Sequence, residues 1–299
     1  MPNNAAARPW HEAWQEALYG PSGFFMREAP AAHFRTNVAV PLFGSAVRRL
    51  AELVDDALGR PDPFDVVDVG AGRGELLHAL GEVPDRWRLT GVELAEADVA
   101  FGWADEIPSL TGLLLANEWL DSVPVHVVED GHQVLVDSLG NESQGPPFAS
   151  TWAASWWPSG GRKEIGEARD LAWSSAVSRV ERGLAVAIDY GHTAETRRPT
   201  LTGYRDGRQV PPVPDGSCDL TAHVALDSCA AATGAWLLTQ REALHRLGIS
   251  SALPDPDDPS YALGLEQVSQ ARELLDEEGL GGFGWLVHPV GIDAGWMHP

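Results

Sequence analysis

The sequence predicts an α/β fold with a Rossmann-like, doubly wound and mostly parallel sheet. Short apolar runs alternate with amphipathic segments along the chain. One run, 66–69, leads directly into glycines at alternate positions and then into an amphipathic segment, 75–80. Polar side chains follow several of the runs, at the strand ends where open α/β sheets bind their ligands. These three observations together predict a sheet that carries a ligand site at one edge.

The glycine loop after the first run is the firmest candidate site. Gly70, Gly72 and Gly74 allow a tight turn and let a ligand approach the backbone. A dinucleotide fingerprint would place its third glycine at position 75, which is Glu75, and Asp68 precedes the loop. Two carboxylates would repel a pyrophosphate but favour a cation such as S-adenosylmethionine (SAM). We therefore expect these glycines and Asp68 to bind SAM; a glycine loop without a ligand is the alternative.

A second cofactor residue is expected one strand further on. The run 88–94 reads as a short strand that contains Glu93, about 20 residues after the loop, where related folds place a ribose-binding carboxylate. A carboxylate can accept hydrogen bonds from two ribose hydroxyls at once. The alternative is a solvated side chain at a strand end.

Composition limits the kind of partner. The chain has 299 residues, 44% of them hydrophobic, and a net charge of −22, which disfavours binding to the phosphates of nucleic acid. We see no apolar run long enough to span a membrane and no signal peptide in 1–14. Cys218 and Cys229 are the only cysteines, and the histidines form no metal motif. We expect a cytoplasmic protein without metal, nucleic-acid or membrane partner; the oligomeric state stays open, a homodimer being one option.

The remaining pattern predicts the order of elements. We expect helices at 9–20, 41–58, 164–182, 240–247 and 263–275, and strands at 113–116, 184–188, 236–239 and 283–288. A hairpin turns at Asp130-Gly131, and 140–162 and 193–219 read as loops. We expect one domain, 1–299, with a helical cap segment 1–60. Its core comprises 61–123 and 184–299, with insertions at 193–230 and 124–183.

Polar residues at two further strand ends are candidates for chemistry. Asn117 and Glu118 can accept hydrogen bonds from a substrate nitrogen, and Asp121 joins Glu118 on one face if the run is helical. Two such carboxylates can clamp a guanidinium; an ordinary helix N-terminus is the alternative. His192 follows Asp189 and is a candidate base, although a structural turn explains it equally well. From their spacing alone, we expect Asp219 to cap a helix or strand and His223 to be a hydrogen-bonded residue of the core.

The motifs are similar to those of one family over most of the chain. The sequence resembles the MidA-like SAM-dependent methyltransferases, relatives of a mitochondrial complex I assembly factor that methylates a protein arginine. The matching segments, in family order, are 17–25, 33–36, 41–44, 68–74, 116–124, 188–192, 203–205 and 219–224. His33 stands where the family has an acid, Asn37-Val38-Ala39 replaces a Ser-Pro-Glu run, and 93–103 is too short for the usual adenine-side helix.

The resemblance implies a class I methyltransferase core capped by the N-terminal segment and the insertions. It implies that a methyl group is transferred from SAM to a nitrogen of a protein or small molecule. A protein arginine is one such acceptor. Glu118 and Asp121 would steer the acceptor, and His192 or His223 would take the released proton. Arg35, Thr36 and Asn117 would join the cofactor site. A non-catalytic SAM-binding assembly factor and an NAD(P)-dependent oxidoreductase are the alternatives.

Overall fold

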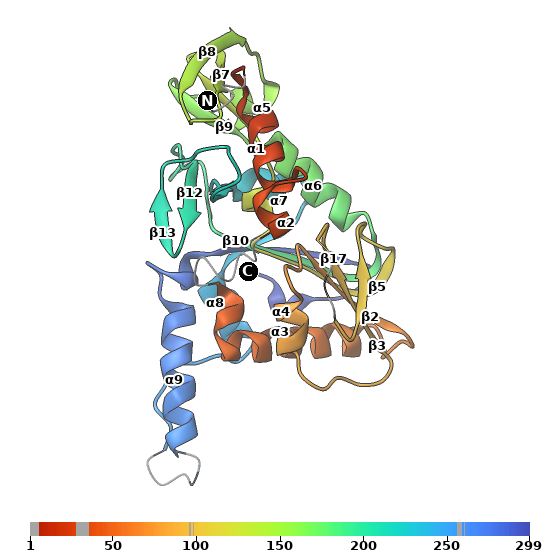
Figure 1. The fold of residues 1–299 in the computed structure, drawn as a ribbon. Coiled ribbons are helices and arrows are strands. Elements are labelled where there is room, and N and C mark those ends of the chain that lie inside the picture. The colour runs from red at the N-terminus through yellow and green to blue at the C-terminus, as the bar shows by residue number, and fades with distance from the viewer. Residues whose placement is uncertain (1–5, 28–35, 96, 98, 256–258, 260) are drawn as a thin grey trace.

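A seven-stranded sheet forms the centre of the protein in a computed structural model that describes residues 6–27, 36–95, 97, 99–255, 259 and 261–299 (Figure 1). Its strands lie in the order β16 (Trp236–Thr239), β17 (Gly284–Val290), β10 (Val180–Asp189), β5 (Leu110–Asn117), β2 (Phe64–Val69), β3 (Trp87–Val92) and β4 (Gly102–Ala104). The five strands from β10 to β4 are parallel, and β17 is antiparallel to both of its neighbours. The expected mostly parallel, doubly wound sheet is therefore confirmed.

Helices cover both faces of this sheet. α3 (Pro41–Ala57), α4 (Glu75–Ala79), α8 (Gln240–Arg246) and α9 (Tyr261–Leu275) pack on one face, and α6 (Glu167–Val177) and α7 (Leu226–Thr233) on the other. α3 starts at a proline and buries Leu50 and Val54 at helical spacing. β2 and β5 are buried along nearly their whole length, which explains their continuous apolar runs. No helix among the described residues combines the length and apolar character that crossing a bilayer requires.

A smaller sheet lies at the opposite end of the molecule from α9 (Figure 1). It consists of β1 (Arg8–Pro9), β6 (His126–Glu129), β7 (His132–Val136), β8 (Glu142–Pro147) and β9 (Arg162–Ile165). α1 (Trp10–Tyr19) packs against it through two fully buried indoles, Trp10 and Trp14, and α2 (Phe24–Arg27) follows. The predicted N-terminal helix and the hairpin at Asp130-Gly131 are both present.

Three sequence expectations differ from the structure. The expected loop 140–162 contains β8 and α5 (Thr151–Trp156); β8 is a polar edge strand with two prolines, so no apolar pattern marks it. The expected helix 164–182 begins later, because 162–165 form β9; α6 then packs on the large sheet although it lies in the predicted insertion. The excursion 193–219 contains β12 (Thr202–Arg205) and β13 (Arg208–Val210), which join β14 (Asp219–Thr221).

Short pieces complete the fold around the site. β11 (Gly191–His192) pairs with β15 (Val224–Ala225), and this contact holds the end of β10 against the start of α7. The 3₁₀ turns η2 (Asn37–Ala39) and η3 (Leu120–Ser122) precede α3 and follow β5, while η4 (Leu280–Gly282) and η5 (Gly295–Met297) flank β17. All these turns except η5 connect elements that meet near the carboxyl ends of the parallel strands.

The strands β5 and β2 approach each other closely at Gly112 of β5. A Cβ there would lie 2.0 Å from the carbonyl oxygen of Asp65 in β2, and φ is +154°. We predict that Gly112→Ala lowers the free energy of unfolding by about 3 kcal/mol, because two central strands would have to separate. Calorimetric unfolding checks this.

Gly160→Ala is the control, since nothing lies within 4 Å of a Cβ at that position. Its unfolding temperature is expected to equal that of the natural protein. Equal unfolding temperatures for both variants would contradict the packing argument.

Candidate functional site

The glycine loop lies where the winding of the sheet reverses, between β2 and β5. Open α/β sheets bind ligands beyond the carboxyl ends of their strands at this place. Gly70, Gly72 and Gly74 have left-handed φ values of 73°, 59° and 85°. A Cβ on Gly70 would lie 2.9 Å from the indole of Trp119. Glycine is therefore required by both backbone conformation and space, and the loop presents its main chain to the cavity.

A cavity of about 360 Å³ opens beside this loop. This volume falls within the roughly 300–1,000 Å³ of small-molecule sites. Glu93, just after β3, forms part of the wall: its Oε2 accepts the N–H of Gly72 at 3.3 Å and its Oε1 accepts that of Leu94 at 2.8 Å. Burial raises the pKa of Glu93, and these N–H donors oppose the rise. The carboxylate is thus fixed between the loop and the cavity.

The charges around the loop favour a cation. Oε2 of Glu75 accepts the backbone N–H of Arg73 at 2.8 Å, so a carboxylate already sits at the start of α4 where a phosphate would bind. Burial, together with the nearby carboxylates of Glu75 and Glu93, raises the pKa of Asp68 to about 8. No hydrogen bond to the Asp68 carboxylate is found among the described residues. A sulfonium or ammonium group would stabilise its charged form, whereas a pyrophosphate would not.

A second, smaller cavity of about 80 Å³ adjoins the first. Both cavities are bordered by Gly70, Gly72 and Glu118. The carboxylates lining the second cavity are those of Asp68, Glu75, Glu118, Asp121 and Asp219. None of its described lining residues is an arginine, lysine or histidine, and Oδ1 of Asp219 is buried without a described partner. The cavity therefore suits a group that brings positive charge and N–H donors.

Glu118 stands at the boundary of the two cavities with a strained backbone. Its φ is +52°, a left-handed value that is uncommon for a residue with a Cβ. Its N–H donates to the carbonyl of Ile188 at 2.8 Å, and its Oε1 accepts the backbone N–H of Asn37 at 3.0 Å and Nδ2 of Asn117 at 3.1 Å. Burial raises the pKa of Glu118 to about 7. These hydrogen bonds stabilise the strained backbone conformation, which places the carboxylate between the two cavities.

Glu118 and Asp121 do not share one face of a helix, although the sequence predicted this. The chain turns at the left-handed Glu118 and forms only the 3₁₀ turn η3, so the two carboxylates meet across a cavity rather than along a helix. Asp121 is 3% exposed; its Oδ2 accepts the hydroxyls of Tyr190 and Thr221. These hydroxyls hold Asp121 in place.

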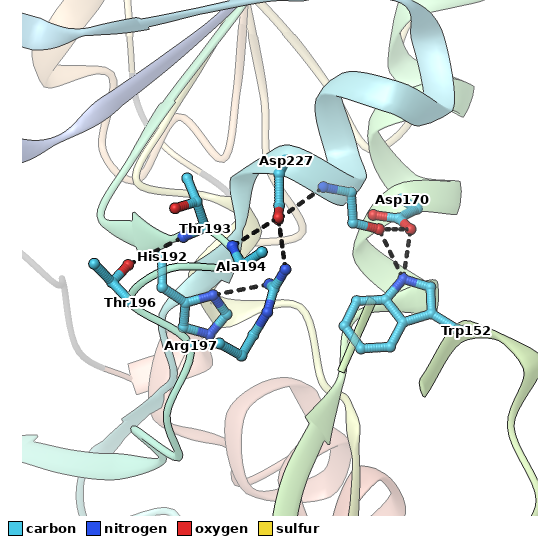
Figure 2. Close-up of polar contacts among 9 residues, drawn as sticks. Trp152, Asp170, His192, Thr193, Ala194, Thr196, Arg197 and Asp227 are labelled. Atoms are coloured by element: carbon cyan, nitrogen blue, oxygen red, sulfur yellow. Dashed lines mark hydrogen bonds and ion pairs between the residues drawn. The ribbon is translucent and has the colours of Figure 1, made fainter. Parts of the chain in front are cut away.

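His192 does not line either cavity. Figure 2 shows Arg197 between His192 and Asp227. Nη1 of Arg197 lies 3.0 Å from Nδ1 of His192, and Nη2 donates to both oxygens of Asp227 at 2.7 Å. Because a guanidinium only donates, Nδ1 is an acceptor and the neutral ring carries its proton on Nε2. Burial and the charge of Arg197 lower the pKa of His192 to about 4. Neither ring nitrogen is free to take a proton, so this geometry disfavours His192 as the base.

His223 lies nearer to the acidic residues. Its ring packs edge-on against Tyr190 at 5.2 Å between centroids, and Tyr190 donates to Asp121. Burial lowers the pKa of His223. It is not part of either cavity wall, so its proton-accepting role stays a prediction.

The other predicted cofactor residues divide between the cavities. Thr36 and Asn117 line the second cavity, and Arg35 lies outside the described residues. Three residues that line the first cavity were not predicted from the sequence: Asp105 and Ile107, which follow β4, and Tyr19. The hydroxyl of Tyr19 donates to the carbonyl of Ser122 at 3.2 Å. β4 has only three residues, partly exposed, so no apolar run marks it. No metal-binding group of three or more His, Cys, Asp or Glu is found in the described part of the chain.

Fold and site together define a Rossmann-like protein that binds a cationic nucleoside cofactor. Residues 86–239 match a family described as putative S-adenosyl-L-methionine-dependent methyltransferases. The chain belongs to this family, which confirms the MidA-like resemblance, and its cofactor is SAM. The donor set fits SAM, since Asp68 and Glu93 offer carboxylates to a cation and a ribose while Glu75 repels a pyrophosphate.

One curated protein and one solved structure are similar to this chain. The chain is 26% identical to the Protein arginine methyltransferase NDUFAF7 homolog, mitochondrial, of Drosophila melanogaster, a match that covers 56% of this chain. The chain spans about half the length of that relative, 52%. A COG1565 superfamily member and likely methyl transferase from Burkholderia thailandensis, bound to S-adenosyl-homocysteine, has the same fold: TM-score 0.77, 24% identity, covering 96% of this chain and 89% of that one.

The burial of Asp68 predicts opposite effects on stability and on binding. With its pKa raised from 3.8 to about 8, the stability it contributes is complete below pH 4 and is lost as pH rises through 8. We predict that Asp68→Asn raises the unfolding temperature much more at pH 9 than at pH 5, because pH 5 lies only about one unit above the usual pKa of the carboxyl. Each pKa unit is worth about 1.4 kcal/mol. The same variant should bind SAM more weakly at pH 9, as measured by calorimetry.

Asp65→Asn, on the same strand, is the control. Asp65 pairs with Arg88 at 2.6 Å and accepts the N–H of Thr111 at 3.0 Å, so its loss should destabilise the protein at both pH values. A gain in stability for Asp68→Asn that is the same at pH 5 and pH 9 would contradict the role of charge burial.

Proposed function

We propose that this protein transfers a methyl group from SAM to a nitrogen, and that the acceptor is an arginine side chain of a protein. The observation that carries the proposal is the second cavity, whose wall holds five carboxylates and no cationic side chain among its described residues. A guanidinium brings the missing charge and N–H donors in a planar fork that matches carboxylates. The name of the Drosophila relative, a protein arginine methyltransferase, agrees with this choice.

The cofactor would lie in the first cavity and reach the edge of the second at the glycine loop, where Asp68 lies. When bound, SAM supplies an electrophilic methyl group on a sulfonium. The loop backbone and Asp68 would hold the cationic end, Glu93 the ribose hydroxyls, and Asp105 the exocyclic amine of adenine. These residues exclude water and fix orientation, which accounts for most of the rate in a displacement reaction.

The acceptor nitrogen must lose a proton during the transfer. Glu118 is placed for this task because it borders both cavities and because burial raises its pKa to about 7. A base with a pKa near the working pH is the most effective proton acceptor. Asp121 and Asp219 would accept the remaining N–H bonds of the guanidinium. The proton thus goes to Glu118 rather than to His192.

The cellular setting is inferred from the thiols. Cys218 and Cys229 are both buried and free, which agrees with a reducing compartment such as the cytoplasm. The net charge of −22 agrees with a protein acceptor that is basic around its arginine.

Methyl transfer is tested with isotopically labelled SAM and host-cell extract. We expect label in arginine-containing peptides, identified by mass spectrometry, and a loss of at least about 100-fold in rate for Glu118→Gln. Glu129→Gln, on the exposed end of β6, is the matched control and should keep full rate. Binding of SAM without label in any product would favour a non-catalytic assembly factor.

Cofactor identity is tested separately by calorimetry with SAM and NAD. We predict binding of SAM alone, and a loss of about 10–100-fold in SAM affinity for Glu93→Ala, the value of one or two hydrogen bonds to a charged group. Equal affinity of the natural protein and Glu93→Ala would contradict the ribose role. Tight binding of NAD would favour an oxidoreductase.

A further inference from the structure

A line of buried hydrogen bonds runs from β17 to Glu118. The indole Nε1 of Trp285 donates to Oε1 of Gln240 at 3.2 Å, and Nε2 of Gln240 donates to Oδ1 of Asn37 at 2.8 Å. Nδ2 of Asn37 donates to Oδ1 of Asn117 at 3.2 Å, and Nδ2 of Asn117 donates to Oε1 of Glu118 at 3.1 Å. We call these five residues the amide chain.

The direction of the amide chain is fixed at both ends. An indole nitrogen can only donate a hydrogen bond, and a carboxylate can only accept one. Each amide between them must therefore turn its oxygen toward Trp285 and its nitrogen toward Glu118. Every hydrogen bond within the line is donated in the direction of Glu118, so the donors favour negative charge on its carboxylate.

Burial makes this arrangement rigid. Trp285, Gln240 and Asn37 are each 0% exposed, and unpaired polar groups in such surroundings are costly. The backbone N–H of Asn37 adds a second donor to Oε1 of Glu118 at 3.0 Å. All hydrogen bonds that the described residues make to this carboxylate fall on Oε1. The other oxygen, Oε2, is left for the cavities.

We propose that the amide chain is a positioning device that holds the Glu118 carboxylate in one orientation and stabilises its charged form. Asn37, Gln240 and Trp285 are then positioning residues, although none of them lines either cavity. The inference rests on the proposed function in one respect, namely that Glu118 accepts the proton from the methylated nitrogen. It assigns a part in the site to residues of η2, α8 and β17, far apart in the sequence.

The amide chain acts against the other charges that face Glu118. Asp68, Glu75, Asp121 and Asp219 share the second cavity, and Asp189 of β10 lies behind it. Glu93, Arg73 and Tyr19 lie along the first cavity. The carboxylates and burial disfavour a charged Glu118, and the donors of the amide chain oppose them. These surroundings are the same in all the variants below, so a difference between variants reports on the amide chain.

The direct test is the titration of the Glu118 carboxyl in the protein without cofactor, by carbon-detected magnetic resonance, with Glu118→Gln for assignment. Trp285→Phe and Gln240→Met each interrupt the amide chain. We expect the titration midpoint of Glu118 to rise in both, by up to about one pH unit, because the amides between the break and Glu118 are no longer held in one orientation and their donors favour the charged carboxylate less.

Trp173→Phe is the matched control. Trp173 is also 0% exposed, and its indole Nε1 donates to Thr233 at 3.1 Å on the other face of the sheet. This variant loses the same ring and N–H, so its unfolding temperature should fall as in Trp285→Phe. The midpoint of Glu118 should stay at its natural value.

A binding measurement gives a second readout. The preference for SAM over S-adenosylhomocysteine, which lacks the sulfonium charge, should rise with pH as Glu118 and then Asp68 ionise. Trp285→Phe and Gln240→Met should move this rise to higher pH, and in a Glu118→Gln background they should have no further effect.

Two results would overturn the proposal. An unchanged midpoint in Trp285→Phe and Gln240→Met would show that the amide chain only packs the core. An equal shift in Trp173→Phe would show a general loosening. A failure to bind SAM or to transfer methyl groups would contradict the proposed function, yet the carboxyl titration would still decide the role of the amide chain.

Discussion

The site depends on the burial of carboxylates at the carboxyl ends of three neighbouring strands. Asp68 lies at the end of β2, just before the glycine loop. Glu118 directly follows β5, and Asp189 is the last residue of β10. Removing these groups from water disfavours their charge, and the pKa of each is raised. The fold tolerates this cost because packing of the sheet between two helix layers fixes the strand ends. A cationic ligand relieves the cost, so affinity for cations follows from the same burial.

The features that the sequence predicted well are local. The strand, glycine turn and helix around Gly70 follow one another without a gap, and Glu93 lies one strand later at a fixed distance. Such patterns are set by backbone geometry and by the period of the apolar residues. The helices α3 and α9 and the sheet class were predictable for the same reason.

What the sequence did not reveal depends on tertiary contact or on weak local patterns. Asn37 and Gln240 are ordinary polar residues at the starts of helical segments, and only folding brings them within 2.8 Å of each other. β8 lacks an apolar face, and β4 is too short to show a period. The prediction that Glu118 and Asp121 share a helical face was wrong because the left-handed φ of Glu118 changes the direction of the chain.

The left-handed backbone of Glu118 has a consequence for how this chain responds to selection. Glycine, and to a lesser degree asparagine, adopts such a φ at lower cost than glutamate, by roughly 1 kcal/mol. Random substitution at this position therefore offers added stability together with loss of the carboxylate. Laboratory evolution for heat resistance alone would drift toward glycine at 118, and a retained glutamate would then indicate that the reaction, not the fold, was under selection.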